Sequence, residues 1–257
     1  MPAAATRPSV TTRVLALLAA FDERTPRLTL SELARAAGLP PSTAHRLLAE
    51  LTAWGALQRD PEGGYCVGQR LWRLGTLAPV QRELRDIALP AMQDLYEATH
   101  ENVHIAVRDG LTALYVERIW GRTSVPLVSG AGRPLPLHAT GVGKVLLAWA
   151  DADVREACLA RLTPVTRYTV TERGRLLREL AGVRRLGYAR TAEEMTLGTC
   201  SIAVPVFAVG DPARAVAALG LVTSTVRRDL TRFVPALQVA AATITRGQAA
   251  RQQTWVG

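Results

Sequence analysis

The sequence has 257 residues, 48% of them hydrophobic, and this length suits about two domains with sizeable cores. No apolar run reaches the roughly 18 residues that span a bilayer, and the N-terminal segment MPAAATRPSV lacks the apolar centre of a secretory signal. We therefore expect a cytoplasmic protein without a membrane partner. The net charge of +9 suits a polyanionic partner, but the charge is spread along the chain and does not mark one binding end.

The three cysteines, Cys66, Cys158 and Cys200, show neither paired spacing nor a metal-ligand pattern. They predict reduced thiols, and no metal or cofactor is expected. The first predicted helix follows Ser9, which can cap it. Apolar residues then recur at helical spacing, namely Val10, Val14, Leu17, Leu18 and Phe21. We expect this helix to cover the back of the next two helices.

Residues 28–51, LTLSELARAAGLPPSTAHRLLAEL, predict two short helices around a tight turn. Thr29 and Glu32 can form a capping box at the start of the first helix, and Gly38 can supply a left-handed residue at its end. Ser42 or Thr43 is expected to open the second helix. The inner face of the second helix is apolar and consists of Ala44, Leu47, Leu48 and Leu51.

The outer face of that second helix is polar near its N-terminus. It carries Ser42, Thr43, His45 and Arg46. Such side chains can bond the groove edges and phosphates of double-stranded DNA, although a helical hairpin with a solvated face is the alternative. The following residues favour DNA binding, because predicted strands at 56–59 and 65–67 flank the turn sequence DPEGG. This order is that of a winged helix-turn-helix, with Arg59 on the wing near phosphate or the minor groove.

Two helical segments follow the predicted wing, and the first, residues 69–77, completes a predicted DNA-binding domain of residues 1–77. The second segment, residues 78–99, is a predicted linker helix in which Pro90 indicates a kink or two consecutive helices. Its apolar stripe consists of Leu84, Ile87, Ala88, Met92 and Leu95. The stripe must be buried, either against a second chain or under the next domain, and the sequence does not distinguish these two alternatives.

From Asn102 the apolar period changes from that of a helix to the alternation of strands. Strands are predicted within residues 103–107, 113–116, 124–128, 202–209 and 216–223. Helices are predicted near residues 141–149, 151–162, 171–186 and 228–246. Strands at both ends with helices between them predict an α+β domain, residues 100–257, on a mainly antiparallel sheet.

Two motifs are similar to enzyme sites. Residues 100–104, HENVH, match the H-E-x-x-H pattern of zinc peptidases, which must lie on a helix for two histidines to reach one ion. The second half of this run alternates as a strand, so a metallo-hydrolase is only weakly supported. Residues 141–144, GVGK, lack the glycine spacing and the following serine or threonine of a phosphate loop. We predict no catalytic residues and no enzyme activity.

The glycines of that second motif still have a physical use. Gly141 precedes a predicted helix, and the free N–H groups at a helix start favour a small carboxylate. The alternative is a tight turn that is needed only for close packing.

Several motifs in one order make the sequence resemble the IclR family of bacterial transcription regulators along nearly its whole length. In the first part these motifs are SELA (31–34), GLP (38–40) and STAHRLL (42–48). In the second part they are PLHAT (136–140) with Gly143-Lys144, Gly187-Tyr188, Glu193-Glu194 with Gly198, and IAVPV (202–206).

The resemblance implies a winged helix-turn-helix, a linker helix used in dimerisation, and a GAF-like effector-binding domain. It also implies a homodimer or dimer of dimers on a pseudo-palindromic operator. The effector would be a small organic acid from carbon or aromatic catabolism. By the resemblance, its pocket would be formed by Leu127, Gly141, Val142, Thr191, Ser201, Gly220 and Val222.

Three of these positions depart from the better-known carboxylate-binding pattern of the family. Thr191 replaces an acidic residue, and Gly220 and Val222 stand where hydroxyl side chains are expected. The departures predict a less polar and roomier pocket that suits a larger or partly apolar acid. The competing functional class is a GAF-type sensor whose helical end binds a protein partner instead of DNA.

Overall fold

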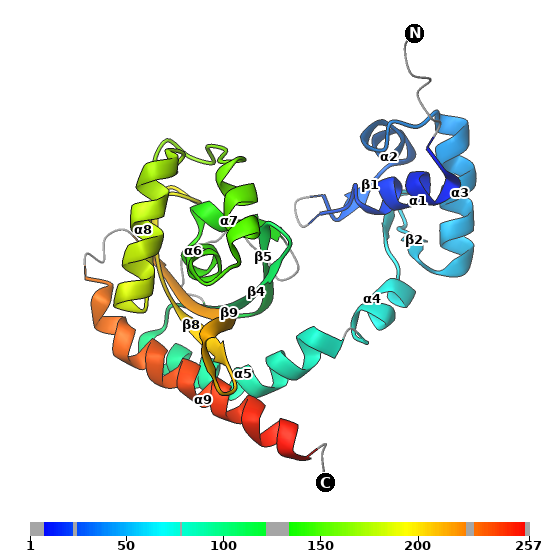
Figure 1. Ribbon diagram of the computed structural model, residues 1–257. Helices are drawn as coiled ribbons and strands as arrows, with labels where there is room; N and C mark the ends of the chain where they lie inside the picture. Colours follow the sequence, from blue (N-terminus) through cyan, green and yellow to red (C-terminus); the bar gives the residue numbers. More distant parts are fainter. Residues whose placement is uncertain (1–7, 23–24, 78, 122–133, 225–228, 255–257) are drawn as a thin grey trace. The chain divides into compact units, whose positions relative to one another are not determined.

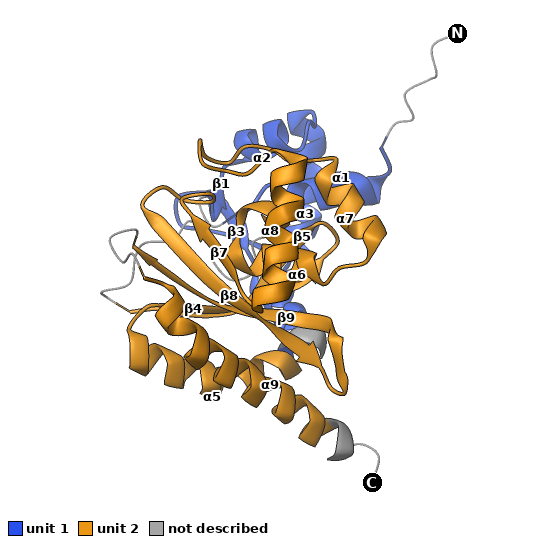
Figure 2. Ribbon diagram, turned by 60° about the vertical axis from the view of Figure 1, so that its left-hand side comes forward, with its two compact units in different colours: residues 1–82 blue, residues 83–257 orange. Residues whose placement is uncertain are grey.

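The computed structural model describes residues 8–22, 25–77, 79–121, 134–224 and 229–254. The chain divides into two compact units, residues 1–82 and residues 83–257, and each is described by itself (Figures 1 and 2). Within the described ranges, no helix is both long enough and apolar enough to cross a membrane.

Unit 1 combines three packed helices with a small antiparallel sheet. The helices are α1 (Val10–Leu18), α2 (Leu30–Ala36) and α3 (Pro41–Trp54), and α4 (Gln69–Gly75) follows the sheet. The strands, in the order β1-β3-β2, are β1 (Arg27–Leu28), β3 (Tyr65–Val67) and β2 (Leu57–Arg59). The core between them contains Leu17, Leu33, Ala44, Leu47, Leu48 and Tyr65, all buried.

Of the three helix starts in unit 1 for which the sequence predicts a cap, two have it. Ser9 accepts a hydrogen bond from the Thr12 N–H, and Thr29 and Glu32 form the predicted capping box. The exception is α3, which begins at Pro41 and has no side-chain cap from Ser42 or Thr43. Proline fits the first helical position because that residue needs no N–H partner and its fixed φ already suits a helix.

Unit 2 is built on a sheet whose described strands lie in the order β6-β5-β4-β9-β8-β7, with every neighbouring pair antiparallel. The strands are β4 (Asn102–Asp109), β5 (Thr112–Ile119), β6 (Pro134–Pro136), β7 (Ala189–Ala192), β8 (Thr199–Ala208) and β9 (Asp211–Ser224). β8 and β9 form a long hairpin, whereas the outermost strands β6 and β7 are short. The strand predicted at 124–128 lies outside the described residues.

Helices cover both faces of this sheet (Figures 1 and 2). α5 (Pro79–Thr99) and α9 (Val234–Thr254) lie on one face, and α6 (Gly141–Ala148), α7 (Ala152–Leu159) and α8 (Arg173–Leu186) lie on the other. The alternation of β4 serves both layers. Val103 and Ile105 pack into the core with α5 and α9, whereas Ala106 packs into the core with α6.

The apolar stripe of α5 is buried within unit 2. Leu84, Ala88, Met92 and Leu95 belong to the core formed with the sheet and α9, so these residues are covered by the chain's own sheet. α5 is one helix through Pro90, which excludes two consecutive helices. Pro90 is exposed, so the backbone carbonyl that loses its N–H partner at this turn lies on the solvent side.

Other differences from the sequence prediction concern short or terminal elements. The two-residue β1 and the four-residue β7 were not predicted, because such short strands carry too little alternation to detect. A 3₁₀ turn occupies Thr231–Phe233, so α9 begins at Val234 rather than near Arg228.

Candidate DNA-binding surface and effector cavity

The N-terminal turns of α3 present a polar face to solvent. Ser42, His45 and Arg46 are exposed and Thr43 is half-buried, while the apolar side chains of the same turns lie in the core of unit 1. The helical period causes this division, because apolar residues that recur every three or four positions lie on one face of a helix. A helix with such a free polar face can enter the major groove of B-DNA.

Two arginines of this region have defined partners. Arg46 pairs with Glu50 at 2.9 Å, but both side chains are more than 60% exposed, so this pair is weak and leaves the guanidinium free to bind DNA. Arg59, on the wing strand β2, donates a hydrogen bond to the hydroxyl of the buried Tyr65 at 2.7 Å. This bond ties the Arg59 side chain to the neighbouring wing strand β3.

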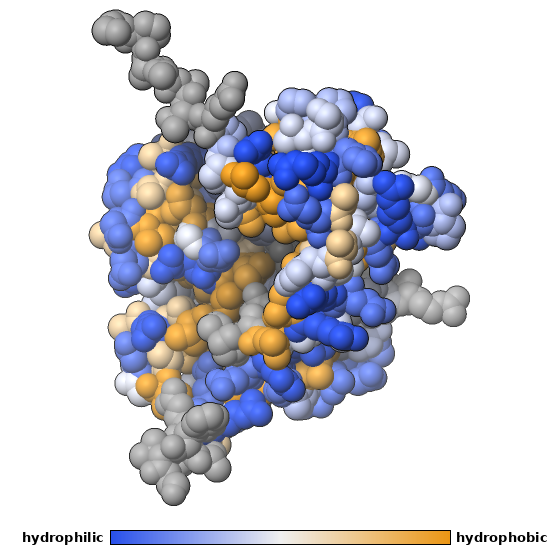
Figure 3. All heavy atoms as spheres, turned by 90° about the vertical axis from the view of Figure 1, so that its right-hand side faces the viewer, coloured by the Kyte–Doolittle hydropathy of each residue, from blue (hydrophilic) through white to orange (hydrophobic). Residues whose placement is uncertain are grey.

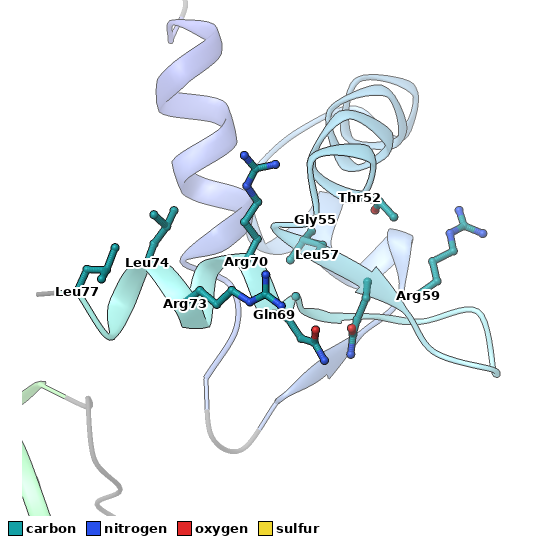
Figure 4. A pocket seen from close by; sticks show the side chains of 11 residues that line it. Thr52, Gly55, Leu57, Arg59, Gln69, Arg70, Arg73, Leu74 and Leu77 are labelled. Carbon is teal, nitrogen blue, oxygen red and sulfur yellow. The ribbon is translucent and has the colours of Figure 1, made fainter.

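A surface groove of about 730 Å³ lies beside the wing, between the end of α3, β2 and α4 (Figure 4). Arg59 extends outward from β2, and Arg70 and Arg73 come from α4. The Arg70 guanidinium stacks over Trp54, 4.3 Å from the ring centroid. Among the described residues that line the groove none is acidic. Arg70 and Arg73 were not predicted as part of a binding surface, because the hydrophobic pattern of residues 69–77 indicates only a connecting helix.

A much smaller cavity lies on the helical side of the unit 2 sheet, where α6 begins. Four of the predicted effector residues contribute to its wall, namely Gly141, Thr191, Ser201 and Val222. Its volume is about 30 Å³, and one water needs roughly 10–15 Å³ of such space, so it holds about two waters. As bounded by the described residues, this cavity is therefore smaller than the roomier pocket that the sequence predicts.

Two further predicted residues, Val142 and Gly220, do not line this cavity, and Gly220 is closely packed. A Cβ on Gly220 would lie 3.0 Å from His104 Nε2 and 3.1 Å from Val142 Cγ1. The room left by the missing side chain is therefore filled by neighbouring groups. Burial, with a smaller effect of the nearby Arg118 charge, lowers the pKa of His104 to about 3, so its imidazole is neutral. Leu127 lies outside the described residues.

The start of α6 fits closely against β8. Thr140 caps the helix by accepting from the Gly143 N–H at 3.0 Å. A Cβ on Gly141 would lie only 2.6 Å from Ser201 Oγ, so a larger residue there would displace the serine hydroxyl. Ser201 Oγ in turn lies 2.5 Å from Thr191 Oγ1. The helix N-terminus and two hydroxyl groups therefore meet at one point of the cavity, where a carboxylate oxygen would find donors.

The remaining described wall residues were not selected from the sequence. They are Tyr115, Leu135, Thr140, Glu194, Met195, Thr196 and Thr199. Glu194 had been noted only as part of a family motif. Most of the others come from β5, β6 and the segment between β7 and β8, whose approach to α6 depends on the sheet order rather than on any local pattern.

Lys144, the only lysine of the chain, lies one turn into α6 and is 1% exposed. Its ammonium donates to Glu194 Oε1 at 2.7 Å, to Glu194 Oε2 at 2.8 Å and to Glu179 Oε2 at 2.6 Å. Burial raises the pKa of Glu194 above its usual value, and the Lys144 charge only partly opposes this shift. We call these three side chains the Lys144 cluster.

The H-E-x-x-H match does not form the helical arrangement that a zinc peptidase requires. His100 follows the end of α5 with a φ of 55°, and His104 lies within β4. Across the described ranges, no group of three or more potential ligand side chains is placed to hold a metal ion.

Two family models match the chain over most of its length. The model of the IclR helix-turn-helix domain matches residues 10–61, and the model of the bacterial transcriptional regulator IclR C-terminal part matches residues 77–246. The chain belongs to the IclR family of bacterial transcription regulators. This IclR-family chain is therefore a DNA-binding transcription regulator, and the predicted α+β fold class with an N-terminal helix-turn-helix is confirmed.

Individual relatives agree with this family membership. The IclR-family chain is 34% identical over 240 residues to the HTH-type transcriptional regulator XynR of Escherichia coli (strain K12), covering 91% of this chain and 94% of that protein. It is 32% identical over 216 residues to the transcriptional repressor IclR of the same strain, covering 80% and 79%. These homologues are regulators rather than enzymes.

Among solved structures, the chain is similar to an IclR homolog of Microbacterium hydrocarbonoxydans that was crystallised in complex with 4-hydroxybenzoate. The two share 32% sequence identity and a TM-score of 0.86, over 94% of this chain and 100% of that one.

Proposed function

We propose that this IclR-family regulator binds a pseudo-palindromic operator in the cytoplasm through α3 and its wing, and that a small organic acid controls this binding. The observation that carries the DNA part is the exposed polar face of α3 above a fully packed apolar face. Ser42, Thr43, His45 and Arg46 contact the major groove and its backbone. Arg59 contacts phosphate or the minor groove from the wing.

The proposed assembly is a homodimer or a dimer of dimers. Hydrophobic residues reach the surface among hydrophilic ones on the face that Figure 3 presents. In and just after α4, Trp72, Leu74 and Leu77 are 69%, 49% and 68% exposed. Three such side chains in six residues favour contact with a second copy, because contiguous exposed apolar surface is uncommon on a monomer.

Replacing Arg46 by Ala tests the DNA part of the proposal. We expect operator affinity to fall by about 1–3 kcal/mol if the guanidinium bonds a base in two places. The measurement is a mobility shift over a salt series, with the DNA upstream of the regulator's own gene. Arg173→Ala, which removes an exposed arginine of α8 in unit 2, is the control and should leave affinity unchanged. Equal affinity of Arg46→Ala and the parent at every salt concentration would remove Arg46 from the interface.

The second part of the proposal places the acid in the cavity at the start of α6. Its carboxylate is bonded by the helix N-terminus at Gly141 with Val142, and by the hydroxyls of Ser201 and Thr191, which lie 2.5 Å apart. Val222, Leu135 and Met195 give the same cavity an apolar side that suits a ring or chain. The 4-hydroxybenzoate held by the Microbacterium relative is an acid of this kind.

A Gly141→Val substitution tests this site. The added Cβ would approach Ser201 Oγ to 2.6 Å and separate the helix start from the hydroxyl pair. We expect 4-hydroxybenzoate and benzoate to raise the Tm of the parent protein and to leave that of the variant unchanged. Gly182→Val is the matched control, because a Cβ there meets open space on α8. An equal rise in Tm for Gly141→Val would contradict the proposed site.

A further inference from the structure

The segment between β7 and β8, residues 193–198, forms one wall of the effector cavity. Met195 and Thr196 contribute to that wall, together with Glu194. The segment is tightly wound, since Glu193 has a φ of 58° and Gly198 a φ of 77°. The Glu193 N–H donates to the Thr199 carbonyl at 2.7 Å, and Glu193 Oε2 accepts from the Gly198 N–H at 3.0 Å. We call this segment the wall loop.

The wall loop is fastened to its surroundings mainly through Glu194. The carboxylate accepts two bonds from Lys144 and a longer one, 3.4 Å, from the Val170 N–H. The Glu194 carbonyl also accepts from the Thr169 hydroxyl at 2.7 Å. Because Lys144 lies on α6, the helix whose start forms the proposed carboxylate site, the Lys144 cluster joins the two sides of the cavity.

We infer that Lys144 is a positioning residue of the effector site, which fastens the wall loop to α6 and holds the cavity too small for an organic acid. Admission of the effector then requires this fastening to loosen. The inference rests on the proposed effector site. It assigns a role to a lysine that contacts neither DNA nor the proposed carboxylate site.

The size of the cavity supports this inference. Pockets for organic ligands usually measure several hundred Å³, whereas this one measures about 30 Å³. α6 and the strands beneath it are packed in a buried core, so they have little room to retreat. The wall loop is the less packed side, because Leu197 at its tip is 55% exposed. Among the described walls of the cavity, the wall loop is therefore the one with most room to move.

The charges of the Lys144 cluster also support the inference that Lys144 holds the wall loop against α6. Lys144 is shared by two carboxylates, and the second of them, Glu179, also accepts from Arg175 at 3.2 Å. An anionic effector would add a negative charge next to Glu194, which is already hard to ionise because it is buried. Effector binding and the Lys144–Glu194 contact therefore oppose each other, and by thermodynamic linkage each weakens the other.

The first test uses the fact that Lys144 is the only lysine. N-hydroxysuccinimidyl acetate acylates free amines, so mass spectrometry of the peptide that contains residue 144 reports how often this ammonium is released. We expect Glu194→Gln to raise the acylation rate of Lys144 at least tenfold. Glu193→Gln is the matched control in the same loop, since its amide oxygen can still accept from Gly198, and its rate should stay within twofold of the parent. Equal rates for Glu194→Gln and the parent would overturn the inference.

The second test measures ligand affinity by calorimetry with two probes, 4-hydroxybenzoate and its uncharged methyl ester. Loosening the wall loop should strengthen the binding of both probes at least fivefold in Glu194→Gln, with Glu193→Gln unchanged. Unchanged or weaker binding would overturn the coupling, and a gain confined to the anion would assign the effect to charge repulsion alone. If the parent and all variants bind neither probe, the proposed effector site is wrong. The acylation rates still test whether Glu194 holds Lys144 in place.

A third variant covers the case in which Glu194→Gln does not fold. Glu179 is 32% exposed, so Glu179→Gln removes one carboxylate of the Lys144 cluster at the protein surface. We expect it to raise the acylation rate of Lys144 about threefold. A rate equal to that of the parent would count against the cluster as the fastening.

Discussion

Lys144→Met is expected to lower the free energy of unfolding of unit 2 by about 3–5 kcal/mol at pH 7. The substitution leaves Glu194, whose side chain is 8% exposed, without the cation that accounts for most of its bonds. An unpaired buried carboxylate keeps its desolvation cost and loses the compensating attraction. Urea unfolding monitored by circular dichroism gives the measurement. Arg173→Met, which breaks the exposed pair with Glu156, should cost less than about 1 kcal/mol.

The difference in free energy of unfolding between the parent and Lys144→Met should become smaller as the pH falls. Burial holds the pKa of Glu194 above its unfolded value, and loss of Lys144 removes the influence that opposes this rise. A carboxyl whose pKa is raised on folding stabilises the fold when protonated and loses that contribution as the pH rises through the folded pKa. We therefore expect a smaller difference between parent and variant at pH 4.5 than at pH 7. A difference that is equal at both pH values would show that Glu194 does not carry the cost.

Leu47→Ala is expected to lower the free energy of unfolding of unit 1 by about 2–5 kcal/mol and to abolish operator binding at 37 °C. Leu47 is fully buried between α1, α2 and α3, and its loss leaves a cavity directly beneath the polar face of α3. A domain of this size has only a few kcal/mol of stability to lose. The measurements are urea unfolding and a mobility shift.

Leu15→Ala is the control for that substitution, because Leu15 lies on α1 and is 59% exposed. It should change stability by less than about 0.5 kcal/mol. Binding of 4-hydroxybenzoate by the Leu47→Ala protein should persist. Full operator affinity in Leu47→Ala would contradict the dependence of the DNA-binding face on this core.

Local patterns in the sequence were sufficient to predict most elements of unit 1 and the longer elements of unit 2. The capping box at Thr29, the left-handed Gly38 after α2 and the alternation in β4 act over a few residues, so each can be identified in isolation. The start of α3 was misplaced by one or two residues, because proline and hydroxyl residues compete for adjacent positions at a helix start.

The effector cavity was harder to predict because its shape depends on distant residues. Gly141 and Ser201 meet only because α6 packs on β8, and the resemblance alone brought them together. His104 fills the space beside Gly220 across the strand pair β4 and β9, a contact that no local pattern indicates. The Lys144 cluster joins residues 35 and 50 positions apart, and a lone lysine in a sequence is normally expected at the surface.

The outermost strands of the unit 2 sheet restrict how copies of this chain can associate. β6 has proline at two of its three positions, so only Leu135 retains a backbone N–H, and β7 at the other described margin has four residues. Neither can template a long run of additional backbone hydrogen bonds with a neighbouring molecule. Along these two described margins, a continuous sheet from subunit to subunit is thereby disfavoured, and side-chain surfaces remain as the means of self-association there.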